Sequence, residues 1–325
     1  MIRPAAILAT LLAGLPTATW ADPPALALPL ACTLGQDCFI QQYVDRDPGL
    51  AAMDHACGPL TYDTHKGTDI RLVHRNQIKG IGVPVLAAAK GTVTAVRDHT
   101  PDIAQGDAGA PNVDGRECGN GVLLDHGDGW KTMYCHMRKG SIAVVPGLRV
   151  KQGDTLGLVG LSGQTEFPHV HIKVTNNDAI IDPFQPRGSS CTDGAQPQLW
   201  SPPLPYTPGG LLSAGFAGSN LDLPAIRQSG DHARDITATS PALAVWGFFY
   251  GLRQHDIIRV TVRFPDGALL ADQTFTLTQN QAEGYRLSGR KRRAEPWPAG
   301  LYQGVVSLTR DGREIDGKQL QLTID

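Results

Sequence analysis

Alternating apolar and polar residues predict a chain built mainly of β-strands. The clearest run is residues 169–174, in which three aliphatic residues alternate with three polar ones. Side chains two apart on a strand point to the same face, so His169 and His171 would present their imidazoles together. Pro168 cannot donate to a sheet, so we expect the strand to begin there. Such a histidine pair suits a metal site, although two half-exposed polar residues on an ordinary strand have the same pattern.

Shorter runs of the same kind recur through residues 61–187. A hairpin is predicted for residues 121–135, with its turn at Asp128, and pairs of short strands are predicted for residues 83–96 and 150–159. Apolar residues in this region never recur at helical spacing for three turns. We therefore predict an all-β domain here.

The flanking segments differ in character. Residues 22–60 are interpreted as an N-terminal extension, and residues 188–210, rich in Pro and Gly, as a linker. Residues 211–325 show strands at the spacing of a smaller, immunoglobulin-like β-sandwich. The 37 Gly and 24 Pro among 325 residues favour many turns, and the net charge of −2 gives no reason to expect nucleic-acid binding.

The N-terminus has the pattern of a secretory signal peptide. Arg3 supplies the positive charge, and residues 5–15 form an apolar run too short to span a membrane. We expect cleavage after Ala21, which makes residues 1–21 the signal peptide of an exported protein. An uncleaved, buried N-terminus is the alternative.

Six cysteines fit an exported protein and suggest three disulfides. Folding the hairpin about Asp128 brings Cys135 near Gly121 and within reach of Cys118. We therefore predict a disulfide between Cys118 and Cys135 and leave the other pairings open. A zinc site made by cysteines is disfavoured, because the chain contains no Cys-x-x-Cys pair.

His65 and Asp69 form a second candidate group. On an ideal strand four residues span roughly 13 Å, so these two side chains can reach one ion only if the chain bends at Gly67. Together with either His169 or His171 they would make the two-imidazole, one-carboxylate set of an open, catalytic zinc site. A lone surface histidine and aspartate is the alternative.

His136 is a third candidate, near the end of the predicted hairpin. Strand alternation puts His136 on the same face as Tyr134, with Cys135 on the other face, so His136 could face the same groove. We interpret His126 as structural, because the tip of a turn tends to point away from a groove.

Taken in order, these pieces resemble the lysostaphin/LytM-type zinc metalloendopeptidases, which cut the peptide bridges of bacterial peptidoglycan. The resemblance covers roughly residues 61–187, and each motif is weak alone, but the shared order is specific. The motifs are His65-x-Gly67-x-Asp69, Gly121–Gly129, Tyr134-x-His136-Met137, Val150–Gly157, Gly160–Gly163 and Pro168–His171.

The resemblance implies an antiparallel LytM-like β-sheet domain that binds one Zn²⁺. It implies that the metal ligands are His65, Asp69 and His171, and that the catalytic histidines beside them are His136 and His169. The residues alone do not show which of His169 and His171 is the metal ligand. Tyr62 is a candidate for a tyrosine with which this family stabilises the transition state.

The implied function is hydrolysis of peptidoglycan cross-links in the periplasm through a metal-activated water. Two alternatives remain open: an inactive LytM-like module that binds or activates another cell-wall hydrolase, and a peptidase that acts on proteins. The C-terminal domain could bind the cell wall or a protein partner. Its basic run Arg290–Arg293 could hold an anionic polymer, although such a run is usually a solvated turn.

Overall fold

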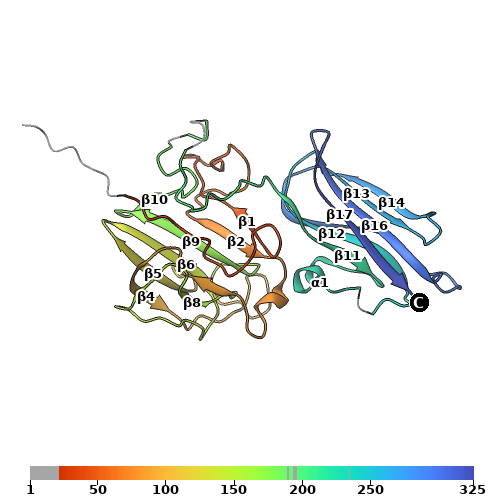
Figure 1. The fold of residues 1–325 in the computed structure, drawn as a ribbon, viewed down its shortest axis with the longest axis horizontal. Coiled ribbons are helices and arrows are strands. Elements are labelled where there is room, and N and C mark those ends of the chain that lie inside the picture. Colours follow the sequence, from red (N-terminus) through yellow and green to blue (C-terminus); the bar gives the residue numbers. More distant parts are fainter. Residues whose placement is uncertain (1–21, 189, 193–195, 234) are drawn as a thin grey trace, which may run out of the picture.

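The computed structural model describes residues 22–188, 190–192, 196–233 and 235–325. The predicted signal peptide therefore lies outside the described residues. Figure 1 shows two lobes side by side, the first carrying strands β1–β10 and the second β11–β17. Within the described ranges, no helix has the length and apolar character needed to cross a membrane.

An eight-stranded antiparallel sheet forms the first lobe. Its strands lie in the order β1–β2–β9–β6–β5–β4–β7, and β10 also pairs with β9. Their bounds are β1 Cys38–Gln42, β2 Thr68–Leu72, β4 Gly91–Arg97, β5 Asn120–Gly127, β6 Trp130–Met137, β7 Arg149–Val150, β9 His169–Asn176 and β10 Ala179–Ile181. Two further strands pair separately, and one 3₁₀-helix follows β2; these are β3 Pro84–Leu86, β8 Thr155–Leu158 and η1 Arg75–Ile78.

The predicted hairpin is confirmed: β5 and β6 pair with Val122 opposite Tyr134. The other two predicted pairs do form strands, but their members do not pair with each other. Instead β3 pairs with β8, and β4 pairs with β7. The reason is that β4 already has β5 on one edge and β7 on the other, so no edge remains for β3.

The predicted extension supplies an edge strand to the large sheet. In the β1–β2 pairing, Ile40 lies opposite Ile70. Tyr43, which follows β1, is fully buried in the core of the lobe, as are Val170 and Ile172 of β9. The aliphatic face of β9 is thus the core face, as its alternation predicts.

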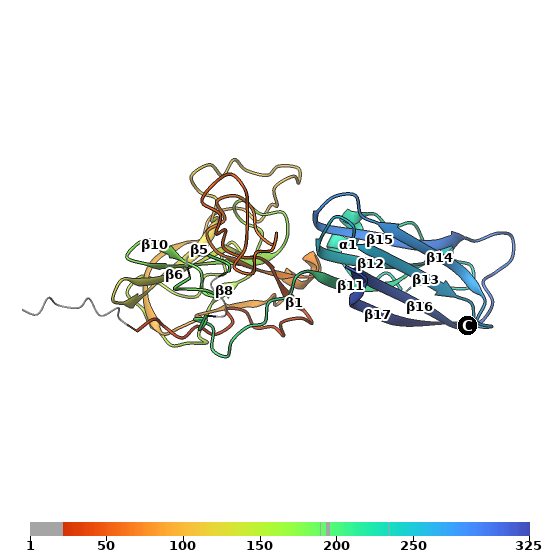
Figure 2. The ribbon, with the colours of Figure 1, turned by 90° about the horizontal axis from the view of Figure 1, so that it is seen from above.

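The predicted sandwich is confirmed in the second lobe. One sheet has the order β11–β12–β15 and the other β14–β13–β16–β17. The bounds are β11 Gly210–Ala217, β12 Ala242–Leu252, β13 Ile257–Arg263, β14 Leu269–Thr276, β15 Gln281–Lys291, β16 Gly300–Arg310 and β17 Arg313–Ile324. A short helix, α1 (Leu223–Gln228), follows β11 and lies toward the first lobe (Figures 1 and 2).

The two lobes share a hydrophobic cluster at their junction. Phe39 and Val73 from the first lobe pack in one cluster with six buried side chains of the second. Those six are Leu212, Ala217, Ile226, Trp246, Phe248 and Tyr250. The junction is therefore a continuous packed core rather than a solvated hinge.

Candidate metal and catalytic site

His65, Asp69 and His171 converge at one point, as the family resemblance implies. Nε2 of His65 lies 3.2 Å from Oδ1 of Asp69, and Nδ1 of His171 lies 2.7 Å from the same oxygen. The two histidine nitrogens are 3.2 Å apart. Ligands of one tetrahedral ion at ~2.0–2.2 Å would be separated by about 3.3 Å. The donor set therefore fits a single metal ion held by two imidazoles and one carboxylate.

Gly67 permits this convergence, but for a different reason from the one predicted. The positive φ in this segment, 64°, belongs to Thr64 and not to Gly67. A Cβ on Gly67 would lie 2.5 Å from Nε2 of His171 and 2.7 Å from the carbonyl oxygen of Ile172. Glycine is therefore needed here for the close approach of β9, not for a left-handed bend.

Backbone carbonyls orient three of the four site histidines. A carbonyl oxygen can only accept, so each Nδ1 carries the proton and each Nε2 is left to face the site. The donor–acceptor pairs are His65 to Tyr43 at 2.7 Å, His136 to Ser162 at 2.9 Å and His169 to Phe167 at 2.9 Å. Sequence reasoning missed these partners, because a backbone acceptor has no signature in residue type.

His136 reaches the site by a break in strand alternation. The prediction that His136 shares a face with Tyr134 is wrong: Tyr134 is fully buried in the core, whereas the His136 ring lies 4.5 Å from that of His169. The cause is the φ of 62° at His136, which turns its side chain out of the regular pleat. His136 nevertheless lies beside both histidines of β9, with its ring centre 6.1 Å from that of His171.

Burial sets the charge state of the two extra histidines. It lowers the pKa of His136 well below the ordinary value, and the neighbouring His169 lowers it further. Burial also lowers the pKa of His169, and the Asp69 carboxylate offsets only part of that effect. Both imidazoles are therefore neutral near pH 7. With Nδ1 protonated, each Nε2 is a proton acceptor.

Asp69 is the charged centre of the group. Burial would raise the pKa of its carboxyl, but His65 and His169 hold that pKa well below the usual range. Conversely, burial would lower the pKa of His65, yet the Asp69 carboxylate raises it. Nε2 of His169 lies 3.7 Å from Oδ1 of Asp69, so a proton on that nitrogen would face a negative charge.

Two further residues singled out in the sequence, Tyr62 and His126, differ in their distance from the site histidines. The half-exposed Tyr62 ring is 4.5 Å from that of His65, and burial, together with Asp69, raises the pKa of the Tyr62 hydroxyl. The two ring nitrogens of His126 pair with the carbonyl of Lys90 and the hydroxyl of Thr132. His126 therefore braces a turn, as a structural role would require.

The predicted disulfide between Cys118 and Cys135 is confirmed, with 4.7 Å between the two Cα atoms. It adjoins the site, because the backbone N–H of His136 donates to the carbonyl of Cys118 at 2.8 Å. The pairings left open are Cys32–Cys38 and Cys57–Cys191. The second ties the extension to the segment after the first lobe.

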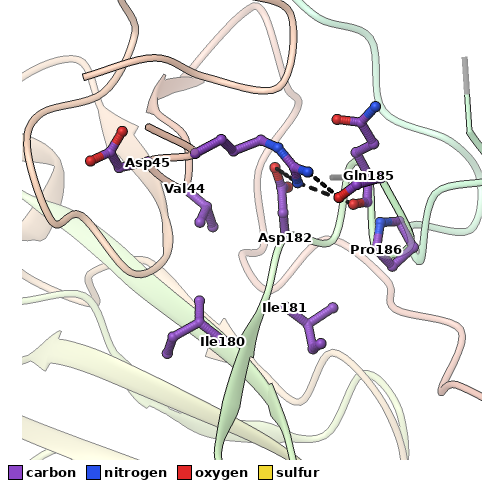
Figure 3. Close-up of a pocket in the computed structure, with 9 residues that line it drawn as sticks. Val44, Asp45, Ile180, Ile181, Asp182, Gln185 and Pro186 are labelled. Carbon is purple, nitrogen blue, oxygen red and sulfur yellow. Dashed lines mark hydrogen bonds and ion pairs between the residues drawn. The ribbon is translucent and has the colours of Figure 1, made fainter. Parts of the chain in front are cut away.

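A separate hollow of about 230 Å³ lies beside the extension (Figure 3). Its lining includes Asp45 and Ile181, and the Arg46 guanidinium pairs there with Asp182 at 3.4 Å. None of the five predicted metal-binding and catalytic residues lines it. The backbone N–H of Asp45 donates to the carbonyl of His65 at 2.9 Å, so the hollow adjoins the candidate site without containing it.

Part of the first lobe matches a known protein family. Residues 63–183 match Peptidase family M23. Cell division protein DipM of Caulobacter vibrioides is 30% identical over 121 residues, which is 37% of this chain and 17% of DipM. Peptidoglycan DD-endopeptidase ShyB of Vibrio cholerae is 30% identical over 118 residues, which is 36% of this chain and 22% of ShyB.

A solved structure with the same family designation is also similar. It is the catalytic domain of the prophage-encoded M23 protein EnpA from Enterococcus faecalis. The identity is 25%, the TM-score is 0.31, and the match covers 45% of this chain and 88% of that domain. The chain covers about a fifth of the length of the two curated relatives, DipM and ShyB.

Proposed function

Because residues 63–183 form a domain of Peptidase family M23, we propose that this chain is a zinc-dependent endopeptidase that hydrolyses the peptide cross-links of bacterial peptidoglycan. The observation that carries the proposal is the geometry of the site. Three side chains that could hold a metal ion share one point, and two histidines with lowered pKa values lie beside them. The name of ShyB as a peptidoglycan DD-endopeptidase supports the substrate class.

The proposed zinc ligands are Nε2 of His65, Oδ1 of Asp69 and Nδ1 of His171. Two imidazoles and one carboxylate leave a fourth position open, which is typical of catalytic rather than structural zinc sites. When bound, zinc would supply Lewis-acid polarisation of the scissile carbonyl and a nucleophile from water at neutral pH. Asp69 also screens positive charge that develops on the nearby imidazoles.

His169 and His136 are the proposed proton carriers. Nε2 of each is unprotonated at neutral pH, so it can accept the proton that the nucleophile releases and return it to the leaving amine. A protonated His169 would be stabilised by the Asp69 oxygen 3.7 Å away. The Tyr62 hydroxyl is protonated at neutral pH, and its raised pKa extends this to higher pH, so it can donate a hydrogen bond to the developing oxyanion.

Export to the periplasm is part of the proposal. The N-terminal pattern is that of a signal peptide, and all six cysteines are paired in disulfides. Disulfides form and persist in oxidising compartments, which include the bacterial periplasm. Peptidoglycan is accessible from that compartment.

The direct test incubates zinc-loaded protein with purified peptidoglycan and identifies the released muropeptides by mass spectrometry. We expect products in which a peptide bond of the cross-link is cut, at a rate that chelation abolishes and zinc restores. Intact peptidoglycan in the presence of one zinc per chain would contradict the proposal and favour an inactive binding module. Cleavage of unstructured proteins but not peptidoglycan would instead indicate a protein peptidase.

A further inference from the structure

Arg71 is a buried positive charge at the junction of the two lobes. It follows Asp69 by two residues on β2, lies opposite His169 across the β2–β9 pairing, and is only 1% exposed. Its Nη1 donates to Oε2 of Glu283 at 2.7 Å, and Glu283 belongs to β15 of the second lobe. A buried charge without a partner is costly, so the second lobe neutralises a charge that the first lobe buries.

The Arg71 guanidinium packs against the segment that carries His169. Its Cζ lies 4.6 Å from the centre of the Phe167 ring and 5.4 Å from that of Phe248, which belongs to β12 of the second lobe. The Phe167 ring in turn lies 4.7 Å from the His169 ring. The carbonyl of Phe167 also accepts the Nδ1–H of His169. Phe167 therefore connects Arg71 to both the ring and the tautomer of His169.

The second lobe holds the same segment at a further point. Arg227 of α1 also pairs with Glu283, and its Nη2 lies 3.8 Å from a carboxylate oxygen of Glu166. On the first lobe, Arg75 donates to the carbonyl of Glu166 at 2.9 Å. Cations of both lobes therefore lie against Glu166, three residues before His169.

The junction is rigid enough to transmit these contacts. The Nδ1 of His74, at the start of η1, donates to the carbonyl of Ile226 in α1 at 2.7 Å. Phe39 packs against Tyr250 with 5.6 Å between ring centres. Packed cores have low compressibility and transmit strain. A displacement of Glu283 would therefore also displace Arg71.

We propose that Glu283, acting through Arg71 and Phe167, is a positioning residue that holds the His169 imidazole in its reactive orientation. The second lobe then supports the reaction catalysed in the first lobe, in addition to any role in binding. This inference rests on the proposed peptidase function, in which His169 carries the proton.

The test uses two variants of the full-length chain. Glu283→Gln removes the carboxylate and leaves the buried Arg71 without a counter-charge, although Gln41 and the carbonyl of Leu72 still accept its hydrogen bonds, so loss of folding alone could explain lost activity. The paired variant Arg71→Met, Glu283→Gln removes both charges, and replacing a buried ion pair with neutral groups commonly preserves stability. It also removes the planar group that packs on Phe167. Glu295→Gln, at an exposed position of the same lobe, is the matched control.

We expect the paired variant to keep the wild-type melting temperature and one zinc per chain. Its KM should stay within about twofold, whereas its kcat should fall on the order of 10-fold or more, because small misplacements of catalytic groups cost up to ~10²-fold. Glu295→Gln should match the wild type in every measurement. A folded paired variant with wild-type kcat would overturn the inference and leave Glu283 a merely structural residue.

A second readout separates this inference from the proposed function. The ¹⁵N and ¹³C resonances of the His169 imidazole report its environment and tautomer whether or not the protein hydrolyses peptidoglycan. We expect these resonances to shift in the paired variant and not in Glu295→Gln. Absence of hydrolysis by the wild type would refute the proposed function alone, whereas unchanged His169 resonances in the folded paired variant would refute the positioning role.

Discussion

His74 makes the stability of the lobe junction depend on pH. It is 9% exposed, and its Nδ1 donates to the carbonyl of Ile226 across the junction. Burial lowers the pKa of His74 from the ordinary 6.5 to about 4. Between these values the unfolded chain binds a proton that the folded chain does not bind. The free energy of unfolding should therefore decrease as the pH falls from 6.5 toward 4.

The size of the effect follows from the two pKa values. At about 1.4 kcal/mol per pH unit, the interval between 6.5 and 4 corresponds to up to about 3 kcal/mol. This stability is fully present above pH 6.5 and is lost progressively below it. The loss would be a large part of the total for a protein with a free energy of unfolding of ~5–15 kcal/mol.

His74→Asn isolates this contribution, because asparagine can keep a donor near the Nδ1 position but does not titrate. Urea unfolding of both proteins at pH 7 and at pH 4 gives their difference in free energy of unfolding, in which the effects of all other groups largely cancel. We expect the variant to gain up to about 3 kcal/mol relative to the wild type on acidification. A difference that stays constant with pH would refute the reasoning.

Two other predictions concern the site itself. Gly67→Ala should weaken zinc binding strongly, because its Cβ would lie 2.5 Å from Nε2 of His171; zinc titration checks this, and wild-type affinity would contradict it. Replacing both Cys118 and Cys135 by serine should cost about 3 kcal/mol of stability for the loop they close and also lower kcat by loosening His136. Urea unfolding and steady-state kinetics test this. An unchanged kcat in the folded variant would show that the disulfide does not hold His136 in place.

Local pattern was enough to predict part of the fold. Residues 169–174 alternate strictly, so the strand and its core face could be inferred from side-chain periodicity alone. The turn at Asp128 fixed the register that brings Cys118 to Cys135. The pairing of β3 with β8 could not be predicted, because long-range strand pairing depends on which sheet edges remain free.

The site was predicted in composition but not in its supporting contacts. Histidine and aspartate spacing identified which side chains could meet, since these residue types bind metal ions. The left-handed φ of His136 could not be predicted from the sequence. Tertiary contacts outweigh its intrinsic cost, and such contacts leave no pattern in the local sequence. The salt bridge between Arg71 and Glu283 joins residues 212 positions apart, a separation over which sequence periodicity carries no information.

The central claim is that His171 holds the metal while its neighbour His169 moves the proton. The most direct test measures zinc per chain and peptidoglycan hydrolysis together in His171→Ala and His169→Ala. We predict that His171→Ala loses both zinc and activity, whereas His169→Ala keeps one zinc per chain and loses activity on the order of 10²–10³-fold. Loss of zinc from His169→Ala with retention in His171→Ala would reverse the two roles, and full hydrolysis by both variants would contradict the account.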